Sequence, residues 1–308
     1  MTKNWNDLPD EMKEIVVDNM DIFTRFRLKM CSKNDKRLVE TVPLHCDYMS
    51  VRENYDSSVS VHLNTSCVFL ISSSGVTIYN KRAFKTRSIV FSTLEEGWEM
   101  VKSIFHNVLS KHKVRIGEFF SNMELINVLP TLDVQLHVKQ LQLIRSGVYQ
   151  QQEWVDILAK PPQKLIITRS WNGMGSHAMI KSVKNLIVEG LNDVDDEQLM
   201  NLKAMDMYIG ESQITGNGIN AFVKKMIAED YPLYSHMIFL HESDFELNAL
   251  VDGLTYEILG NLSGEDHRVR INMSPTKLII MTTKLPDPVG KVTLWVVKRR
   301  IMKSKPRF

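Results

Sequence analysis

The chain has 308 residues, with a 44% apolar share, a 24% charged share and a formal net charge of +2. This is an ordinary globular composition, so a disordered chain, a collagenous chain and a strongly basic nucleic-acid binder are all poorly supported. The length is at the upper edge of what one hydrophobic core serves, and it favours two structural units.

The cysteine usage and the apolar patterning predict a reducing compartment, either cytoplasm or nucleus. The chain contains three cysteines without a C-x-x-C spacing, and its first residues lack the apolar stretch of a secretory signal. No apolar run approaches the roughly 18–20 residues of a spanning helix, so no membrane partner is expected. Cysteine-rich zinc patterns and an H-E-x-x-H pair are also missing, and we expect neither a metal site nor a cofactor.

Residues 4–42 are expected to form three short helices. Pro9 suits a first helical turn, Thr24 can begin the second helix, and the stretch 32–40 forms the third before Pro43. Three short helices bury little apolar area, so this segment needs a partner surface for stability.

The period changes after residue 44, where alternating apolar residues indicate strands over 58–92. Two apolar runs, 68–71 and 76–79, flank a Ser-Ser-Ser-Gly turn and predict a hairpin. Thr93 precedes Glu96 at capping-box spacing, and the 3.6-residue period that follows predicts a helix over 94–111.

A loose repeat over residues 134–240 is the most informative feature of the organisation. Short apolar strands recur about every 20–25 residues, at 139–144, 163–168, 184–189 and 203–208. Such a period is typical of leucine-rich-repeat-like stacking, in which parallel strands form one sheet and helices cover one side. An ordinary α/β sheet with similar connections is the alternative.

The remainder of the chain contains an amphipathic helix and a strand-rich end. Apolar residues recur at helical spacing over 219–227, and four strands over 254–298 predict a terminal antiparallel sheet, or β cap. A basic tail begins at Lys298, and it lacks the interleaved aromatics of an RNA-binding segment. We therefore expect no nucleic-acid partner.

The N-terminal segment carries a Leu-Pro-x-Glu run followed by a basic and apolar stretch. The residues concerned are Leu8, Pro9, Glu11, Ile15, Met20, the run from Arg25 to Lys33, and Arg37, Leu38 and Val39. This pattern resembles an F-box, with Lys29 in place of the usual arginine and with Met20 and Met30 in place of leucine. The resemblance implies an F-box at residues 1–45.

Two later stretches, 193–199 and 214–226, resemble the F-box-associated domain of large nematode families of F-box proteins. The second is similar to an I-T-x-x-x-L-N-x-F-L-K-x-W segment, with Met226 in place of tryptophan. The predicted fold is therefore a mixed α+β or α/β one. A small three-helix F-box precedes a degenerate leucine-rich-repeat-like α/β domain over 46–308 with a C-terminal β cap.

The F-box resemblance implies a non-catalytic adaptor that binds a Skp1-like protein and, through it, the cullin of a ubiquitin ligase. Six residues would offer the apolar surface for Skp1: Leu8, Pro9, Ile15, Met20, Leu28 and Cys31. The C-terminal domain would bind an unknown protein substrate. A free-standing interaction scaffold with structural F-box-like helices is the alternative, and a small α/β enzyme is a third hypothesis.

Substrate binding is predicted on the outward side chains of the repeat-like strands. Leu165, Ile167, Met205 and Met207 are expected in the core, which leaves Lys164, Ile166, Thr168, Asn185, Ile187, Glu189, Asp206 and Tyr208 outward. Trp171 is expected as an exposed recognition aromatic in a neighbouring loop, so Trp171 and Tyr208 are the candidate substrate-binding residues.

Catalytic sites receive little support from the sequence. The acidic clusters at 95–96 and 193–197 suit first helical turns, where they complement the helix dipole. Ser176 and His177 lack a nucleophile-elbow frame, and the glycines at 173–175 lack the Lys-Ser/Thr ending of a P-loop.

Overall fold

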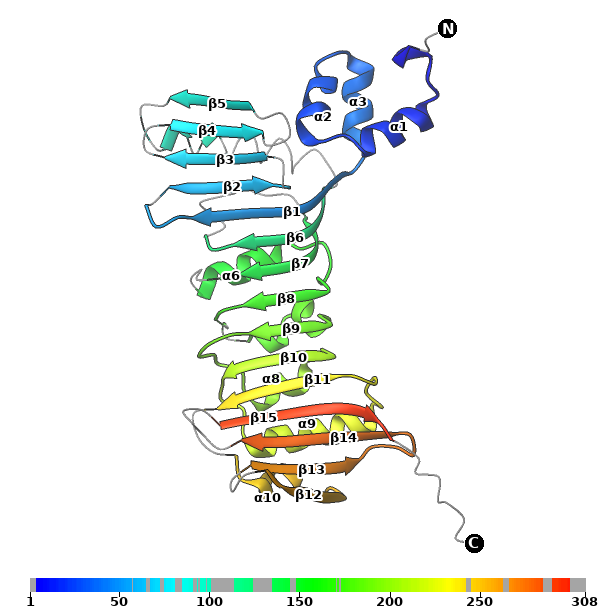
Figure 1. The fold of residues 1–308 in the computed structure, drawn as a ribbon, viewed down its shortest axis with the longest axis vertical. Coiled ribbons are helices and arrows are strands. Elements are labelled where there is room, and N and C mark those ends of the chain that lie inside the picture. Colours follow the sequence, from blue (N-terminus) through cyan, green and yellow to red (C-terminus); the bar gives the residue numbers. More distant parts are fainter. Residues whose placement is uncertain are drawn as a thin grey trace. The chain divides into compact units, whose positions relative to one another are not determined.

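The structure is a computed structural model, and the residues that it describes are 4–56, 58–64, 67–72, 75–80, 85–90, 93, 95–97, 99–100, 114–123, 135–144, 148–169, 171, 173–241, 245–262, 266–284 and 290–299. The chain divides into two compact units, residues 1–162 and 163–308. Figure 1 shows the helices and strands of both units, coloured along the sequence. The fold is mixed α/β, with an N-terminal helical region followed by a large amount of β-sheet.

The N-terminal unit begins with short helices, η1 (Trp5–Asp7), α1 (Asp10–Asp18), α2 (Ile22–Lys29) and α3 (Lys33–Thr41). The predicted three-helix start is confirmed. The second helix begins at Ile22 rather than at Thr24, because the Asp21 carboxylate accepts the Thr24 N–H at 3.0 Å and caps the first turn.

The sheet of the N-terminal unit has the strand order β7-β6-β1-β2-β3-β4-β5. The strands are β1 (Leu44–Glu53), β2 (Val59–Leu63), β3 (Cys67–Ser72), β4 (Gly75–Asn80), β5 (Lys85–Val90), β6 (Val114–Ser121) and β7 (His137–Leu143). Strands β1, β6 and β7 pair in parallel, while β1 to β5 form an antiparallel meander. The predicted hairpin is thus confirmed as β3 and β4.

Among the described residues of this unit, two strands and one helix lie outside the predicted elements. The strands are β1 and β6, which together begin the parallel part of the sheet, and the helix is α6 (Val148–Asp156). Trp154 of α6 packs on Phe119 of β6 with ring centroids 4.8 Å apart. The predicted helix over 94–111 falls mostly outside the described residues, although 95–97 are helical and Thr93 Oγ1 accepts the Glu96 N–H at 3.2 Å.

The C-terminal unit contains four parallel strands, β8 (Lys164–Ile167), β9 (Asn185–Val188), β10 (Asp206–Glu211) and β11 (His236–His241). An antiparallel group follows, β12 (Tyr256–Leu262), β13 (Asp266–Asn272), β14 (Lys277–Lys284) and β15 (Gly290–Lys298), and β15 returns to pair with β11. The strand order is β12-β13-β14-β15-β11-β10-β9-β8. The parallel pairing predicted for the strands at 163–208 and the antiparallel terminal sheet are therefore confirmed.

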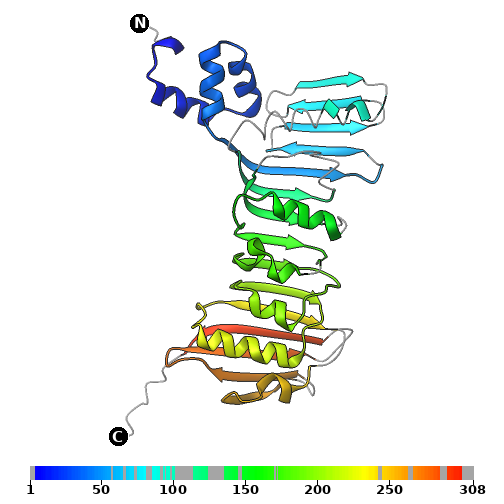
Figure 2. The same cartoon turned by 180° about the vertical axis from the view of Figure 1, so that it is seen from behind.

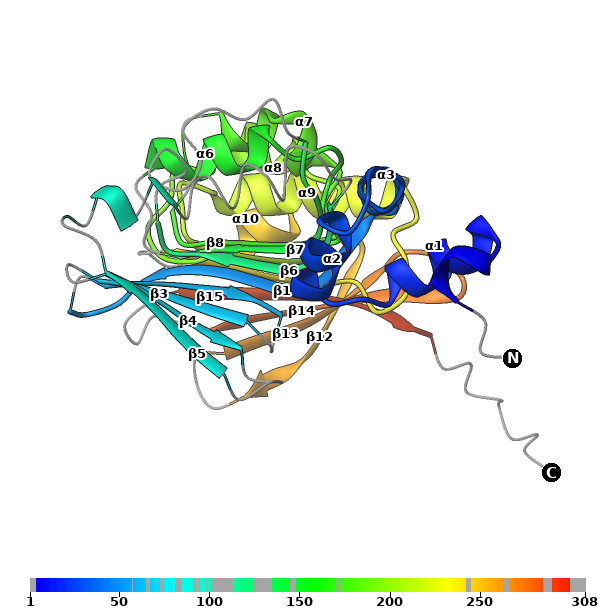
Figure 3. The same ribbon diagram turned by 90° about the horizontal axis from the view of Figure 1, so that it is seen from above.

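The helical elements of the C-terminal unit lie on one face of its sheet, as Figures 2 and 3 show. They are η2 (Met174–Ser176), α7 (Ala178–Lys181), α8 (Asp196–Asn201), α9 (Gly216–Ala228) and α10 (Leu247–Val251). Phe222 of α9 meets Phe239 of β11 edge-on, with ring centroids 6.2 Å apart. The core of this unit therefore lies between α9 and the sheet.

Strand alternation sorts the side chains of this sheet into two sets. Leu165, Ile167 and Met207 are buried, as predicted, while Ile166 and Tyr208 are only half-buried on the side opposite α9. We call this second side the open face. Met205 is 39% exposed, so its predicted place in the core is wrong; it precedes β10, and its N–H donates to the Lys184 carbonyl at 2.8 Å.

None of the helices in the described part of the chain is long and apolar enough to cross a membrane.

Candidate functional site

The helical N-terminal segment has a small apolar cluster of its own. Val17, Val39 and Val42 are buried, and four partly buried side chains pack against them: Trp5, Met20, Leu28 and Leu38. The cluster holds η1, α1, α2 and α3 together. It leaves most of the outer surface of α1 unburied.

Asp35 of α3 fixes the position of η1. Its carboxylate accepts hydrogen bonds from the Trp5 indole N–H at 2.7 Å and from the Ser32 hydroxyl at 2.6 Å. The hydrogen bonds from Ser32 and then Trp5 lower the pKa of Asp35 below its ordinary value, because they stabilise the ionised form. Ser32 in turn caps α3, since its Oγ accepts the Asp35 N–H at 3.0 Å.

Arg25 of α2 joins the C-terminal ends of α1 and α3. Its guanidinium is buried and donates to the carbonyls of Val42 at 3.0 Å and of Asp18 at 3.2 Å. Burial lowers the pKa of Arg25, and the nearby Asp18 carboxylate opposes that effect. Lys29 and Glu40 form a second link, from α2 to α3, at 2.8 Å. These contacts hold α2 in place without using its exposed surface.

An exposed apolar stripe runs along α1. Met12 is 52% exposed, Ile15 63% and Val16 40%, while their neighbour Val17 is completely buried. The spacing of the three exposed residues places them on one helix face, opposite the internal cluster. We call Met12, Ile15 and Val16 the α1 stripe. Met30, just after α2, is 86% exposed.

The six predicted Skp1-binding residues occupy two kinds of environment. Pro9, Ile15 and Cys31 are exposed and Leu8 is half-buried, whereas Met20 and Leu28 pack against the internal cluster. Met12, Val16 and Met30 were not among the predicted residues. The i, i+3, i+4 spacing of the α1 stripe was visible in the sequence, but it does not say which side of the helix faces inward.

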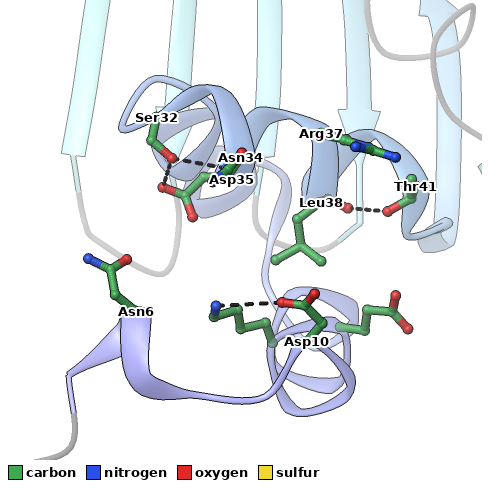
Figure 4. Close-up of a pocket in the computed structure, with 10 residues that line it drawn as sticks. Asn6, Asp10, Ser32, Asn34, Asp35, Arg37, Leu38 and Thr41 are labelled. Atoms are coloured by element: carbon green, nitrogen blue, oxygen red, sulfur yellow. Dashed lines mark hydrogen bonds and ion pairs between the residues drawn. The ribbon is translucent and has the colours of Figure 1, made fainter.

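A polar pocket of about 820 Å³ lies between α1 and α3 (Figure 4). Its lining is mostly charged or amide side chains, with Leu38 at one wall. Asp35 in this pocket is engaged by Trp5 and Ser32, and Asp10 lies 3.6 Å from the Lys13 ammonium. A pocket with this polar lining is expected to hold water rather than a small-molecule ligand, because ligand pockets are lined mostly by apolar side chains.

The two candidate substrate-binding residues lie in different places. Tyr208 of β10 is half-buried on the open face, where burial and then the nearby carboxylates of Glu189 and Glu211 raise the pKa of its hydroxyl. Trp171 is only 4% exposed and meets the His177 ring edge-on at 6.2 Å, so the predicted exposure of Trp171 is wrong. A direct substrate contact by Trp171 stays a prediction, one that its burial makes unfavourable.

The acidic cluster at 193–197 acts in capping. Asp195 accepts the Gln198 N–H at 2.8 Å and so caps α8, while Asp196 accepts the N–H and the hydroxyl of Thr215 at 2.7 and 2.6 Å. Thr215 caps α9 in its turn. Within the described residues, no group of three or more His, Cys, Asp or Glu side chains could hold a metal ion.

The three cysteines are free thiols. Cys31 is exposed, whereas Cys46 and Cys67 are buried. Burial raises the pKa of Cys46 to about 11 and that of Cys67 to about 12, which keeps both in the unreactive thiol form at neutral pH.

Comparison with protein-family models relates the helical segment to a known domain. Residues 5–47 match the F-box domain. The helical segment is therefore similar to an F-box domain. The match covers η1 and α1 to α3 and ends within the first residues of β1. Comparisons with curated proteins and with solved structures gave no match.

Proposed function

We propose that this protein is the substrate-recognition adaptor of a Skp1-cullin-F-box ubiquitin ligase, in which the F-box binds a Skp1-like protein and the C-terminal domain binds the substrate. The F-box at residues 5–47 carries the first half of this proposal, because an F-box suggests a Skp1-binding adaptor. F-box proteins are generally non-catalytic and act in the cytoplasm or nucleus, and we propose the same for this chain.

The exposed side chains of the F-box support a partner on α1. The α1 stripe leaves three large apolar side chains in contact with water, and docking against a protein would remove them from it. Ile15, with Leu8, Pro9 and Cys31, would then contact Skp1 directly. Met20 and Leu28 would act by holding the helices together.

The architecture of the C-terminal unit supports the second half of the proposal. Parallel strands with helices on one face are compatible with the leucine-rich-repeat-like, F-box-associated domain that residues 46–308 resemble. In such a domain the helix-free face is available to a partner, and Tyr208 lies on that face. The alternative remains a scaffold that joins no ligase and uses its F-box-like helices only for structure.

The test is co-purification of the full chain with a Skp1-like protein, using two substitutions of the same type. Ile15→Glu places a charge in the centre of the α1 stripe and should reduce capture at least tenfold, since central apolar anchors are typically worth about 2 kcal/mol or more. Val90→Glu is the matched control, because Val90 is 83% exposed on β5 and outside the F-box. Equal capture of the two variants would exclude the α1 stripe as the Skp1 surface.

A further inference from the structure

The open face of the C-terminal unit carries a continuous row of apolar side chains. Ile166, Ile187, Tyr208 and Ile238 are direct cross-strand neighbours on β8, β9, β10 and β11. All four are half-buried, in contrast to the fully covered residues that alternate with them. We call these four residues the apolar row.

Aromatic rings extend this surface towards the antiparallel strands. Trp295 of β15 is 50% exposed, lies opposite His236 of β11 and meets the His236 ring edge-on at 5.2 Å. Its other cross-strand neighbour is Ile280 of β14. Half-exposed tryptophan and tyrosine side chains are the residue types that most often anchor protein interfaces.

A second row of side chains on the same face is acidic at one end and basic at the other. Glu211 pairs with Leu240, Leu240 with Lys291, and Lys291 with Lys284 on successive strands. With roughly 4.8 Å between neighbouring strands, the acidic and basic ends are about 10–15 Å apart. Glu189 strengthens the acidic end, because it lies close enough to act on the pKa of Tyr208 together with Glu211.

The charges at both ends are available to a partner. Glu189 and Lys284 are exposed, Glu211 and Lys291 are half-buried, and within the described part of the chain none of the four forms an ion pair. A nucleic acid or an anionic membrane surface presents mainly negative charge, which the two glutamates would repel. A polypeptide can present both signs beside apolar side chains, so the open face is complementary to a protein segment.

We propose that the open face binds a protein segment whose apolar side chains lie on the apolar row and Trp295, with a basic residue at the Glu189 and Glu211 end and an acidic residue at the Lys284 and Lys291 end. The inference rests on the proposed function in taking this segment to be part of the ubiquitination substrate. Beyond the proposed function, it specifies the kind of segment that the substrate must contain: apolar residues with a basic residue at one end and an acidic residue at the other.

The test uses the full chain and a phage-displayed library of random 16-residue peptides. Enriched peptides should combine a cluster of apolar or aromatic residues with opposite charges on either side of it. Synthetic copies of these peptides are then measured by fluorescence anisotropy. Failure to enrich any peptide, or enrichment of peptides without this pattern, would overturn the proposal.

Two sets of variants locate the binding. Tyr208→Ala should weaken the selected peptides at least tenfold, and Tyr55→Ala, at a fully exposed tyrosine in the N-terminal unit, is the matched control. Lys284→Glu combined with Lys291→Glu should weaken them to a similar extent, and a peptide with its acidic residues changed to lysine should regain affinity for that double variant. This charge exchange keeps the proposal testable even where Tyr208→Ala fails to fold. Unchanged affinities in the folded variants would place the peptides elsewhere and contradict the proposal.

Light scattering of the same samples tests whether a second copy of this chain, rather than a substrate, binds to the open face. A dimer of the unmodified chain that the double lysine variant dissociates would show that the face binds itself, which would overturn the substrate assignment. Skp1 binding is measured separately on the same protein. Retained Skp1 binding without peptide binding contradicts only this inference, whereas peptide binding without Skp1 binding contradicts only the adaptor proposal.

Discussion

Trp171 offers a direct test of the division between core and open face in the C-terminal unit. This unit contains one buried and one half-exposed tryptophan: Trp171 is 4% exposed, whereas Trp295 is 50% exposed. Truncating each to alanine removes the same atoms from two different surroundings. The two variants therefore form a matched pair.

The expected loss of stability follows from the buried area. An aromatic side chain buries roughly 150–250 Å² on folding, and at about 25 cal/mol per Å² its burial stabilises the fold by about 4–6 kcal/mol as an upper bound. Measured Trp→Ala changes in cores fall near 3–5 kcal/mol, so we expect about this loss for Trp171→Ala. Trp295→Ala should lose about half as much or less, because half of its surface is already in water.

Urea unfolding followed by far-ultraviolet circular dichroism measures both losses on the full chain. We expect Trp171→Ala to unfold at a much lower urea concentration than Trp295→Ala, and we expect peptide binding to the open face to be reduced only in Trp295→Ala. A Trp171→Ala variant as stable as the unmodified protein would refute the buried position of this ring. Such a result would also restore Trp171 as a candidate recognition residue.

Three further predictions concern other contacts. Gly218→Ala should destabilise the protein by more than about 1 kcal/mol in the same unfolding assay, because a Cβ there would overlap the Asp196 carboxylate. Combining it with Asp196→Ala should recover part of the loss. The hydrogen bond from the Trp5 indole N–H to Asp35 should be fully formed above about pH 4 and be lost as the pH falls through the lowered pKa of Asp35. The NMR resonance of the Trp5 indole N–H should therefore shift in acid. A resonance that stays unchanged until Asp35 is fully protonated would contradict this hydrogen bond. Iodoacetamide at pH 8 should modify Cys31 alone in the native protein and all three cysteines after denaturation, and mass spectrometry counts the modified residues. Modification of Cys46 or Cys67 in the native protein would contradict their burial and raised pKa values.

The elements that could be predicted are those with a regular local period. The stretch 219–227 has helical spacing and forms α9, and the strands at 163–208 pair in parallel with Leu165 and Ile167 in the core. The F-box was predictable because its Leu-Pro-x-Glu run and its basic stretch are both local in sequence, and the family match at 5–47 confirms it. In each case the signal lies within one element.

The first strand was missed because its alternation changes phase. Leu44 and Cys46 are buried, but the next buried residue is Met49, and the parallel partner β6 shifts in step, from Ile116 to Phe119. The backbones approach closely at this shift, where a Cβ on Gly117 would lie 2.5 Å from the Asp47 carbonyl oxygen. A period of two read from either strand alone fails at such a position.

The candidate sites were only partly predictable, since exposure depends on contacts between distant residues. Trp171 follows β8 and looks like a loop residue in the sequence, yet it is covered in the folded unit. Likewise Leu28 belongs to the F-box pattern but packs against the buried cluster of Val17, Val39 and Val42, which lies outside its own helix. The charged row on the open face depends on the return of β15 beside β11, which no local pattern indicates.

Calorimetric titration of the full, unmodified chain with a purified Skp1-like protein tests the central claim most directly. The adaptor account predicts a one-to-one complex with a dissociation constant of about 1 μM or tighter, typical of a stable specific interface. Absence of binding at protein concentrations well above that value would contradict the account and leave the F-box helices with a structural role alone.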